Sequence, residues 1–228
     1  MKLTQTCLLC SQSHQQSLAL CPGCQQDLPW LGHHCQRCAQ LLPHEQMLCG
    51  QCLQTNPIQQ RTLAAFEYCF PITPLIQQLK NNRPLVLARL LGRFLAQAAQ
   101  KSYADDQLPQ VLIPIPLHRK RLGQRGHNPA ALLGFFIEQQ LKIPCLHEVC
   151  ERIQHTPPQQ GLNYAERQKN LRHAFTINPS GLPKNISHLA LIDDVVTTGA
   201  TTQALMRLLK PHVERIDVWC VARTLQKN

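Results

Sequence analysis

The sequence predicts an α/β protein in which a parallel sheet with flanking helices follows a small cysteine-rich module. Four Cys-x-x-Cys pairs are concentrated in residues 7–52. Residues 189–192 form a short apolar run, typical of a buried parallel strand, and a Thr/Gly loop and a helical pattern follow it. Residues 111–116 form a second run of this kind. The 228 residues suffice for about one to one and a half ordinary domains.

Composition excludes several classes of protein. With 16% charged and 5% aromatic residues, neither a charge-rich disordered chain nor a coiled coil fits. No apolar run approaches the roughly 18 residues that span a bilayer. The first residues lack the apolar core of a signal peptide. We therefore expect neither membrane insertion nor secretion.

The cysteine pairs begin at residues 7, 21, 35 and 49, a strict 14-residue repeat. Each Cys-x-x-Cys pair forms a tight turn, called a knuckle, and two knuckles supply the four sulfurs of a closed tetrahedral zinc site. Such a site leaves no open coordination position for catalysis. About 60 residues with few large apolar side chains bury little core, so metal must hold the module together. A structural Zn²⁺ contributes roughly 10–16 kcal/mol to folding. The sequence thus predicts two structural zinc ions on eight ligands: Cys7, Cys10, Cys21, Cys24, Cys35, Cys38, Cys49 and Cys52.

The spacing alone leaves open which two knuckles share each zinc ion. Ten-residue spacers favour consecutive knuckles, that is, two successive ribbons, and the alternative is an interleaved, cross-braced module. A redox role is less favoured because it needs exposed thiols of low pKa. Thiolate ligands persist where thiols stay reduced, which favours the cytoplasm. The remaining cysteines, Cys69, Cys145, Cys150 and Cys220, are expected to pack in apolar surroundings.

Charge is distributed unevenly between the two parts of the chain. The formal net charge is +10, and residues 1–60 hold two bases and two acids, so all of the excess lies in residues 61–228. Such a surface attracts nucleic acid or phosphorylated metabolites, although a merely solubilising charge is the alternative. A polar, proline-marked stretch separates the parts. We expect a zinc-ribbon module at 1–56, a linker at 57–60 and a second domain at 61–228.

The second domain is predicted to open with two helices and to continue with a strand. A later helix and a closing strand carry apolar residues at the expected spacing. In order, the predicted elements are helices 72–80 and 84–100, strand 111–116, helix 129–141 and strand 216–222.

A basic segment follows strand 111–116, and we predict a Gly-containing loop there. Four of the seven residues from 119 to 125 are basic and none is acidic: Arg119, Lys120, Arg121 and Arg125. They are candidates to contact a pyrophosphate or a nucleic-acid backbone, and a solvated loop is the alternative. Farther on, Arg152 and residues 156–172 are polar and basic. This segment suits a lid over an anionic ligand or a plain surface loop.

The stretch from 189 to 202 carries the strongest indication of a ligand site. Asp193 and Asp194 follow the predicted strand, and two carboxylates there suit a sugar diol or a divalent cation. The loop of small and hydroxyl residues after them lets backbone N–H groups surround a phosphate at a helix N-terminus. The alternative, an acidic turn that caps the helix, does not account for the Thr/Gly loop.

These residues resemble the phosphoribosyl-diphosphate (PRPP) signature of type I phosphoribosyltransferases. The resemblance implies that Asp193 and Asp194 engage the ribose hydroxyls, with Mg²⁺ accompanying the ligand. It implies that the loop binds the 5′-phosphate through Thr197, Thr198, Gly199, Ala200 and Thr201. In the purine-salvage branch the first loop position is usually an acid, and Thr197 cannot act as a carboxylate base. The resemblance therefore does not extend to that activity.

The whole chain resembles the ComF/GntX family of competence-associated proteins, in which Cys-x-x-Cys knuckles precede a phosphoribosyltransferase-like domain. Further matching blocks are Leu79-Lys80, residues 114–119, 124–126, Asn128, Arg152, Thr156, Gln159, Gly161-Leu162, Arg167 and Asn170. His127 and Pro129 depart from the family pattern. The resemblance implies cytoplasmic handling of incoming single-stranded DNA during natural transformation, beside a competence helicase and DNA-processing proteins.

Two alternatives remain at the level of the sequence. In one alternative the second domain is an active phosphoribosyltransferase. In the other it keeps the fold but does not use the ligand site, and the zinc ribbon binds nucleic acid. With few aromatic residues, single-strand binding would depend on phosphate attraction more than on base stacking.

Overall fold

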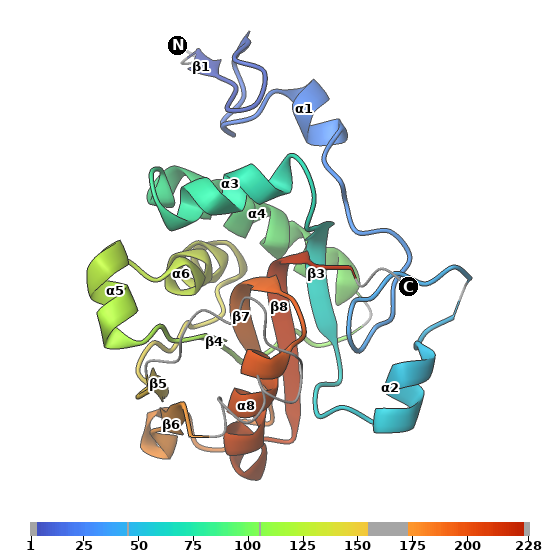
Figure 1. Cartoon of the computed structure of the whole chain (residues 1–228), viewed down its shortest axis with the longest axis vertical. Helices are drawn as coiled ribbons and strands as arrows, with labels where there is room; N and C mark the ends of the chain where they lie inside the picture. Colours follow the sequence, from blue (N-terminus) through green and yellow to red (C-terminus); the bar gives the residue numbers. More distant parts are fainter. Residues whose placement is uncertain (1–3, 45, 105, 155–172, 226–228) are drawn as a thin grey trace.

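The computed structural model describes residues 4–44, 46–104, 106–154 and 173–225, and a four-stranded parallel sheet forms its centre (Figure 1). The strand order is β3 (Thr62–Glu67), β8 (Arg215–Arg223), β7 (His188–Val196) and β4 (Val111–Pro114). This confirms the predicted fold class, an α/β protein with a parallel sheet, flanking helices and a preceding cysteine-rich module.

Side chains of the central strands alternate between two apolar cores. On β7, Leu189 and Leu191 join one core, whereas Ala190 and Ile192 join the other. Both faces are therefore buried, which explains why the strand is a continuous apolar run. The core of Ala190 and Ile192 holds helices α3 (Ile72–Lys80), α4 (Pro84–Ser102) and α6 (Pro129–Leu141), and the core of Leu189 and Leu191 holds α8 (Ala200–Leu209).

Most predicted elements are confirmed with small differences in their bounds, and one prediction is wrong. Helix α3 has the predicted bounds, and so does α6. Strand β7 continues to Val196, so Asp193 and Asp194 lie in the strand and not after it. The predicted basic loop is wrong: residues 119–125 form helix α5 (Arg119–Arg125). This helix has no buried residue and therefore no apolar periodicity from which it could have been predicted.

Strand β3 was not predicted from the sequence, because its apolar run is only four residues long and includes two alanines. A small antiparallel hairpin of β5 (Cys150–Arg152) and β6 (Phe175–Ile177) was also missed. Among the four cysteines expected in apolar surroundings, three are buried, but Cys69 is exposed.

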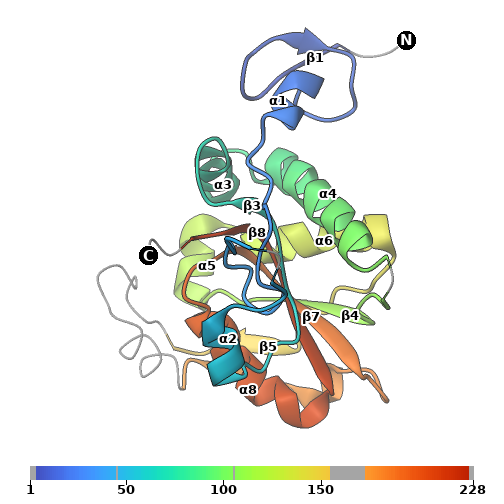
Figure 2. The same ribbon diagram turned by 90° about the vertical axis from the view of Figure 1, so that its right-hand side faces the viewer.

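The cysteine-rich module contains β1 (Gln5–Thr6), β2 (Ser13–His14), α1 (Pro22–Gln26) and α2 (Gly50–Thr55). Its first half projects beyond α3 and α4, whereas α2 lies outside the β3 edge of the sheet (Figures 1 and 2). Two short 3₁₀ helices, Pro179–Gly181 and Lys210–His212, complete the described elements. None of the helices in the described residues is long and apolar enough to cross a membrane.

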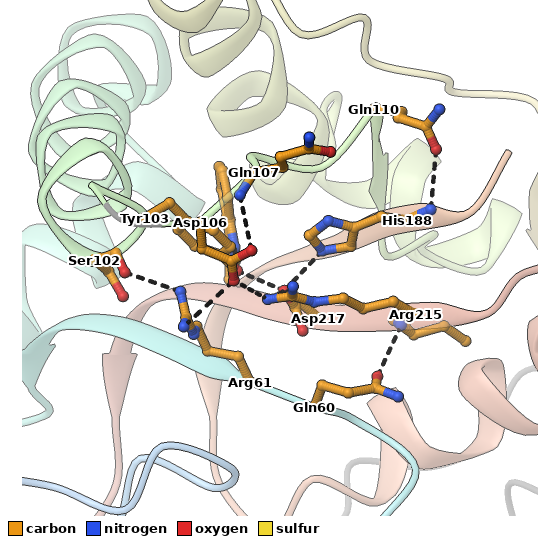
Figure 3. Close-up of polar contacts among 12 residues, drawn as sticks. Gln60, Arg61, Ser102, Tyr103, Asp106, Gln107, Gln110, His188, Arg215 and Asp217 are labelled. Carbon is orange, nitrogen blue, oxygen red and sulfur yellow. Dashed lines mark hydrogen bonds and ion pairs between the residues drawn. The ribbon is translucent and has the colours of Figure 1, made fainter.

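A buried polar network fixes the amino ends of the central strands (Figure 3). Asp217 is fully buried, and its Oδ2 accepts hydrogen bonds from the Tyr103 hydroxyl at 2.6 Å and from His188 Nε2 at 2.7 Å. Arg215 joins this carboxylate to Asp106 on the surface. Burial alone would raise the pKa of Asp217, but the hydrogen bonds from His188 and Tyr103 lower it. The network is therefore structural and lies at the opposite end of the strands from the candidate ligand site.

Candidate functional site: two zinc centres and an anion cavity

The eight predicted zinc ligands form two separate clusters, each built from consecutive knuckles. In each cluster the four sulfurs lie within 4.8 Å of one another: Cys7, Cys10, Cys21 and Cys24 in one, and Cys35, Cys38, Cys49 and Cys52 in the other. Zn–S bonds of about 2.3 Å imply sulfur–sulfur edges of about 3.8 Å in a tetrahedron. The observed Sγ–Sγ distances of 3.7 Å, Cys10 to Cys21 and Cys38 to Cys49, match that value. The clusters thus fit two closed structural zinc sites.

The two ribbons repeat the same local structure 28 residues apart. In both, the N–H of the first cysteine donates to a glutamine carbonyl five residues later, at 2.9 Å from Cys7 and 2.8 Å from Cys35. The residue four positions after each of these cysteines has a positive φ, as at Ser11 and Ala39. A short helix begins at the second knuckle of each ribbon, α1 after Cys21 and α2 after Cys49. The 14-residue cysteine repeat therefore encodes two equivalent ribbons.

The second ribbon is hydrogen-bonded to the α/β domain. The Thr62 hydroxyl donates to the Arg37 carbonyl at 2.6 Å, and the Thr62 N–H donates to the Gln36 carbonyl at 2.8 Å. The buried Arg223 side chain donates to the Cys38 carbonyl at 2.8 Å and to the carbonyls of Val196 and Thr197. One guanidinium thus connects a zinc knuckle to the loop that follows β7.

A cavity of about 190 Å³ opens where β4 and β7 end. The carboxyl ends of parallel strands are the usual ligand edge of an open α/β sheet. Strand β7 supplies both carboxylates, α5 supplies two arginines, and α3 and β5 supply one cation each. The charged residues that line the cavity are Lys80, Arg121, Arg125, Arg152, Asp193 and Asp194.

The two carboxylates are held close together beside one lysine. Lys80 Nζ lies 3.0 Å from Asp194 Oδ2, and Asp193 Oδ1 accepts a hydrogen bond from the Asp194 N–H at 2.8 Å. Burial and, after it, the charge of Asp194 raise the pKa of Asp193 to about 8. A cation or a sugar diol at this position would favour the ionised form of Asp193.

The opposite wall is a cluster of arginines that repel one another. Burial, followed by the charge of Arg121, lowers the pKa of both Arg125 and Arg152, and the aspartates offset part of this effect. Among the described lining residues, four cations face two carboxylates, which leaves an excess of positive charge that a bound anion would neutralise. The cavity is therefore suited to a polyphosphate ligand.

Of the four predicted basic contacts, two line the cavity and two do not. Arg121 and Arg125 face it from α5, whereas the exposed Arg119 forms an ion pair with Glu151 at 3.0 Å. Lys120 is exposed and is not part of the lining. The helical geometry causes this separation, because residues four apart share one face of α5.

The loop between β7 and α8 forms a small adjoining pocket of about 30 Å³, lined by Asp193 and residues 195–202. Gly199 has a φ of +75°, a conformation that L side chains rarely adopt, and it directly precedes α8. The first N–H groups of a helix lack acceptors within the helix. The five residues predicted to bind phosphate, 197–201, all line this pocket.

His127 and Pro129, which depart from the family pattern, help to position the cavity wall. One ring nitrogen of His127 lies 2.9 Å from the Leu79 carbonyl, next to Lys80, so this side chain joins the ends of α5 and α3. Pro129 is the first residue of α6, where its missing N–H costs nothing. The Asn128 side chain caps α6 and donates to the Ile115 carbonyl at 2.9 Å.

Sequence reasoning did not assign Lys80 to the ligand site, and it placed Arg152 only in a segment suited to a lid over an anionic ligand or to a surface loop. Lys80 and Arg152 both lie in blocks that match the family, but Lys80 is more than 110 residues from Asp194 in the sequence. Only the folded sheet brings Lys80 and Asp194 together. The rest of the segment predicted as a lid, residues 156–172, lies outside the residues that the structure describes.

Comparisons with known proteins agree with this architecture. Residues 3–53 match the model of the double zinc ribbon domain. The chain is 35% identical to competence protein F of Haemophilus influenzae over 224 residues, which is 95% of this chain and 96% of that protein. The chain belongs to the competence protein F family. It is also 32% identical to the DNA utilization protein YhgH of Escherichia coli K12 and 33% identical to that of Shigella flexneri, each over 96% of this chain and 90% of the relative.

Proposed function

We propose that this protein acts in DNA uptake, handling incoming single-stranded DNA in the cytoplasm, and that its α/β domain binds PRPP or a related ribose phosphate with Mg²⁺. The single observation that carries the ligand proposal is the cavity in which two carboxylates face four cations beside a Thr/Gly loop. The names of two relatives, a competence protein and a DNA utilization protein, support the role in DNA handling.

In this proposal each wall of the site has one task. Asp193 and Asp194 hold the ribose hydroxyls and the Mg²⁺ that accompanies the diphosphate. Residues 197–201 bind the 5′-phosphate at the start of α8. Arg121, Arg125 and Arg152 neutralise the diphosphate, which is consistent with their mutual repulsion when no anion is bound.

The zinc-ribbon module, residues 1–56, is proposed as the part that meets partner proteins such as a competence helicase. The linker at 57–60 then joins it to the ligand-binding domain, residues 61–228. The excess positive charge of this domain supports contact with single-stranded DNA.

A deletion in the host organism tests the biological role. We expect transformation frequency to fall by at least tenfold when the gene is deleted, and to return with the wild-type gene. The double substitution Asp193→Asn/Asp194→Asn is expected not to restore it. The matched control Asp106→Asn alters a carboxylate outside the cavity and should restore transformation. An unchanged frequency in the deletion strain would contradict the proposal.

The cationic wall favours a second candidate, phosphoribosyl transfer itself. In that reaction the bond from ribose C1 to the diphosphate oxygen breaks, and a bond from C1 to an acceptor nitrogen forms as the acceptor loses a proton. Arg121 and Arg125 would stabilise the departing diphosphate. Diphosphate release in the presence of one of a panel of nucleobases or ammonia donors would support catalysis. No release across the panel would leave PRPP as a bound ligand only.

A further inference from the structure

Arg223 is a buried cation that forms no ion pair with a carboxylate in the described part of the chain. Only 6% of the residue is exposed, and the ion pairs among the described residues do not include it. Its guanidinium donates instead to four backbone carbonyls, those of Cys38, Val196, Thr197 and Thr224. A buried charge is costly unless an opposite charge lies near it. The charge that balances Arg223 must therefore come from another kind of group.

The second zinc ribbon supplies a negative charge of the required kind. Four thiolates outnumber the two positive charges of one Zn²⁺, so a closed site of four cysteines is an anion. Cys38 and Cys52 of this ribbon line the same cavity as Arg223, a space of about 500 Å³ between the ribbon and the α/β domain. The Cys38 knuckle also accepts a hydrogen bond of 2.8 Å from the guanidinium. Arg223 is thus placed as the counter-ion of the second zinc centre.

The same guanidinium orients peptide units of the loop between β7 and α8. In a trans peptide the carbonyl and the N–H of the next residue point in opposite directions. Because the Val196 and Thr197 carbonyls face Arg223, the N–H groups of Thr197 and Thr198 point away from it. Both threonines line the small pocket proposed for the 5′-phosphate, and no described residue accepts a hydrogen bond from the Thr198 N–H. Arg223 therefore keeps this N–H available to a bound phosphate.

The zinc ribbon reaches this loop through Arg223. Among the described residues, no hydrogen bond runs directly from the second ribbon to residues 197–201. The remaining hydrogen bonds between this ribbon and the domain involve Thr62, at the start of β3. A change in the Cys38 knuckle would therefore be transmitted to the loop by the guanidinium.

We propose that Arg223 is a positioning residue for the loop between β7 and α8, and that zinc in the second ribbon holds Arg223 in place. Zinc and the ribose phosphate then bind cooperatively. When the zinc ion is lost, the Cys38 knuckle loses its fixed geometry, Arg223 loses its counter-ion, and the loop loses its orientation. This inference rests on the proposed function, because it concerns the regulation of the proposed PRPP site.

Calorimetric titration of Mg·PRPP into variants that lack one zinc ion tests this coupling. Cys49→Ser removes zinc from the second ribbon and should weaken the binding of Mg·PRPP about tenfold, within the usual range for coupled sites. Cys21→Ser removes zinc from the first ribbon and should change the dissociation constant by less than about twofold, well below this coupling. Arg223→Gln should weaken binding as Cys49→Ser does. The two substitutions together should weaken it no further, because they break the same connection.

Asp217→Asn controls for a general loss of stability. It alters the buried network at the opposite end of the strands and should leave the binding of Mg·PRPP unchanged. The variants are compared at a temperature at which circular dichroism shows each of them to be folded. Wild-type affinity in Cys49→Ser would overturn the inference.

The reverse measurement leaves Arg223 intact and detects an effect that a merely structural arginine would not produce. Linkage requires Mg·PRPP to tighten zinc binding by the same factor as zinc tightens the binding of Mg·PRPP. In Cys21→Ser, which keeps the zinc ion of the second ribbon, saturating Mg·PRPP should raise the concentration of the zinc chelator TPEN that removes half of the metal. The expected increase is about tenfold, with metal content measured by mass spectrometry. Adding Asp193→Asn/Asp194→Asn to this variant should abolish the increase.

The outcomes separate this inference from the proposed function. If the wild type binds Mg·PRPP, but Cys49→Ser and Arg223→Gln bind it equally well and the TPEN titration does not shift, the coupling is wrong while the PRPP site stands. If the wild type does not bind Mg·PRPP, the proposed function fails and this inference fails with it.

Discussion

At the scale of single residues, Asp193 shows a cost in stability at the proposed ligand site. Its carboxyl is held beside Asp194, and burial together with this neighbour raises its pKa to about 8. Between about pH 4 and pH 8 the folded state therefore keeps a proton that the unfolded state has lost, and the stability contributed by this group falls as pH rises. Such a cost is typical of groups selected for binding.

Replacing this carboxyl with a neutral amide should stabilise the protein that has no ligand bound. We expect Asp193→Asn to raise the free energy of unfolding by on the order of 1–2 kcal/mol at pH 8, with little change near pH 4. Urea unfolding at the two pH values measures this difference. Equal or lower stability of the variant at pH 8 would mean that Asp193 is not strained in the folded state.

Asp217 has the opposite behaviour, because its hydrogen bonds lower its pKa. Its contribution to stability is present above the unfolded pKa of about 4 and is lost as pH falls through the lower folded value. Asp217→Asn should cost about 3–5 kcal/mol at pH 7, since it removes the buried carboxylate that accepts hydrogen bonds from Tyr103 and His188, and less below pH 4. Asp106→Asn, at the exposed end of the same network, should cost about 1 kcal/mol or less. A small loss for Asp217→Asn in urea unfolding at pH 7 would contradict the assigned role.

At the scale of elements, the two zinc ribbons are equivalent in local structure but not in their connection to the domain. The second ribbon shares three hydrogen bonds with Thr62 and Arg223, and Ala39 belongs to the core beneath α8. The first ribbon projects beyond α3 and α4 (Figure 2) and joins their core through apolar side chains, among them Leu18 and Leu20, in place of such hydrogen bonds. Loss of one zinc ion should therefore have different consequences in the two ribbons.

Cysteine substitutions can separate these consequences. We expect Cys49→Ser to remove one zinc ion and to lower the stability of the α/β domain by about 2–3 kcal/mol, at about 1 kcal/mol per lost hydrogen bond. Cys21→Ser should remove one zinc ion with a smaller effect on the domain. Metal content by mass spectrometry and the unfolding temperature of each variant provide the comparison. Equal losses of domain stability in both variants would show that the first ribbon is joined to the domain as firmly as the second.

Sequence patterns predicted the elements that carry a strong local signal. The cysteine repeat indicated two metal sites, and the apolar runs and helical spacing indicated β7, β4, α3 and α6. Helix α5 was missed because its stability does not depend on an apolar face, and β3 because its apolar run is short. The aspartate pair was found because it adjoins a recognisable loop. Lys80 could not be assigned, and Arg152 was predicted only as part of a lid or a surface loop, since only tertiary structure brings them to the aspartates.

At the scale of the whole molecule, the loop between β7 and α8 is the point where the parts meet. Its residues line both the pocket beside the cavity proposed for PRPP and the cavity next to the second zinc ribbon. Arg223 donates to the carbonyls of Val196 and Thr197 and to that of Cys38. A ligand on either side therefore contacts a loop that the zinc ribbon helps to position.

The central claim is that the cavity at the end of β7 binds PRPP, and calorimetric titration of Mg·PRPP into the zinc-loaded protein tests it most directly. We predict binding by the wild type that tightens as the pH rises toward 8, because Asp193 then releases its proton more readily. Asp193→Asn/Asp194→Asn should show no binding, whereas Asp106→Asn should bind as the wild type does. The absence of binding heat for the wild type, or equal binding by the double variant, would contradict the account.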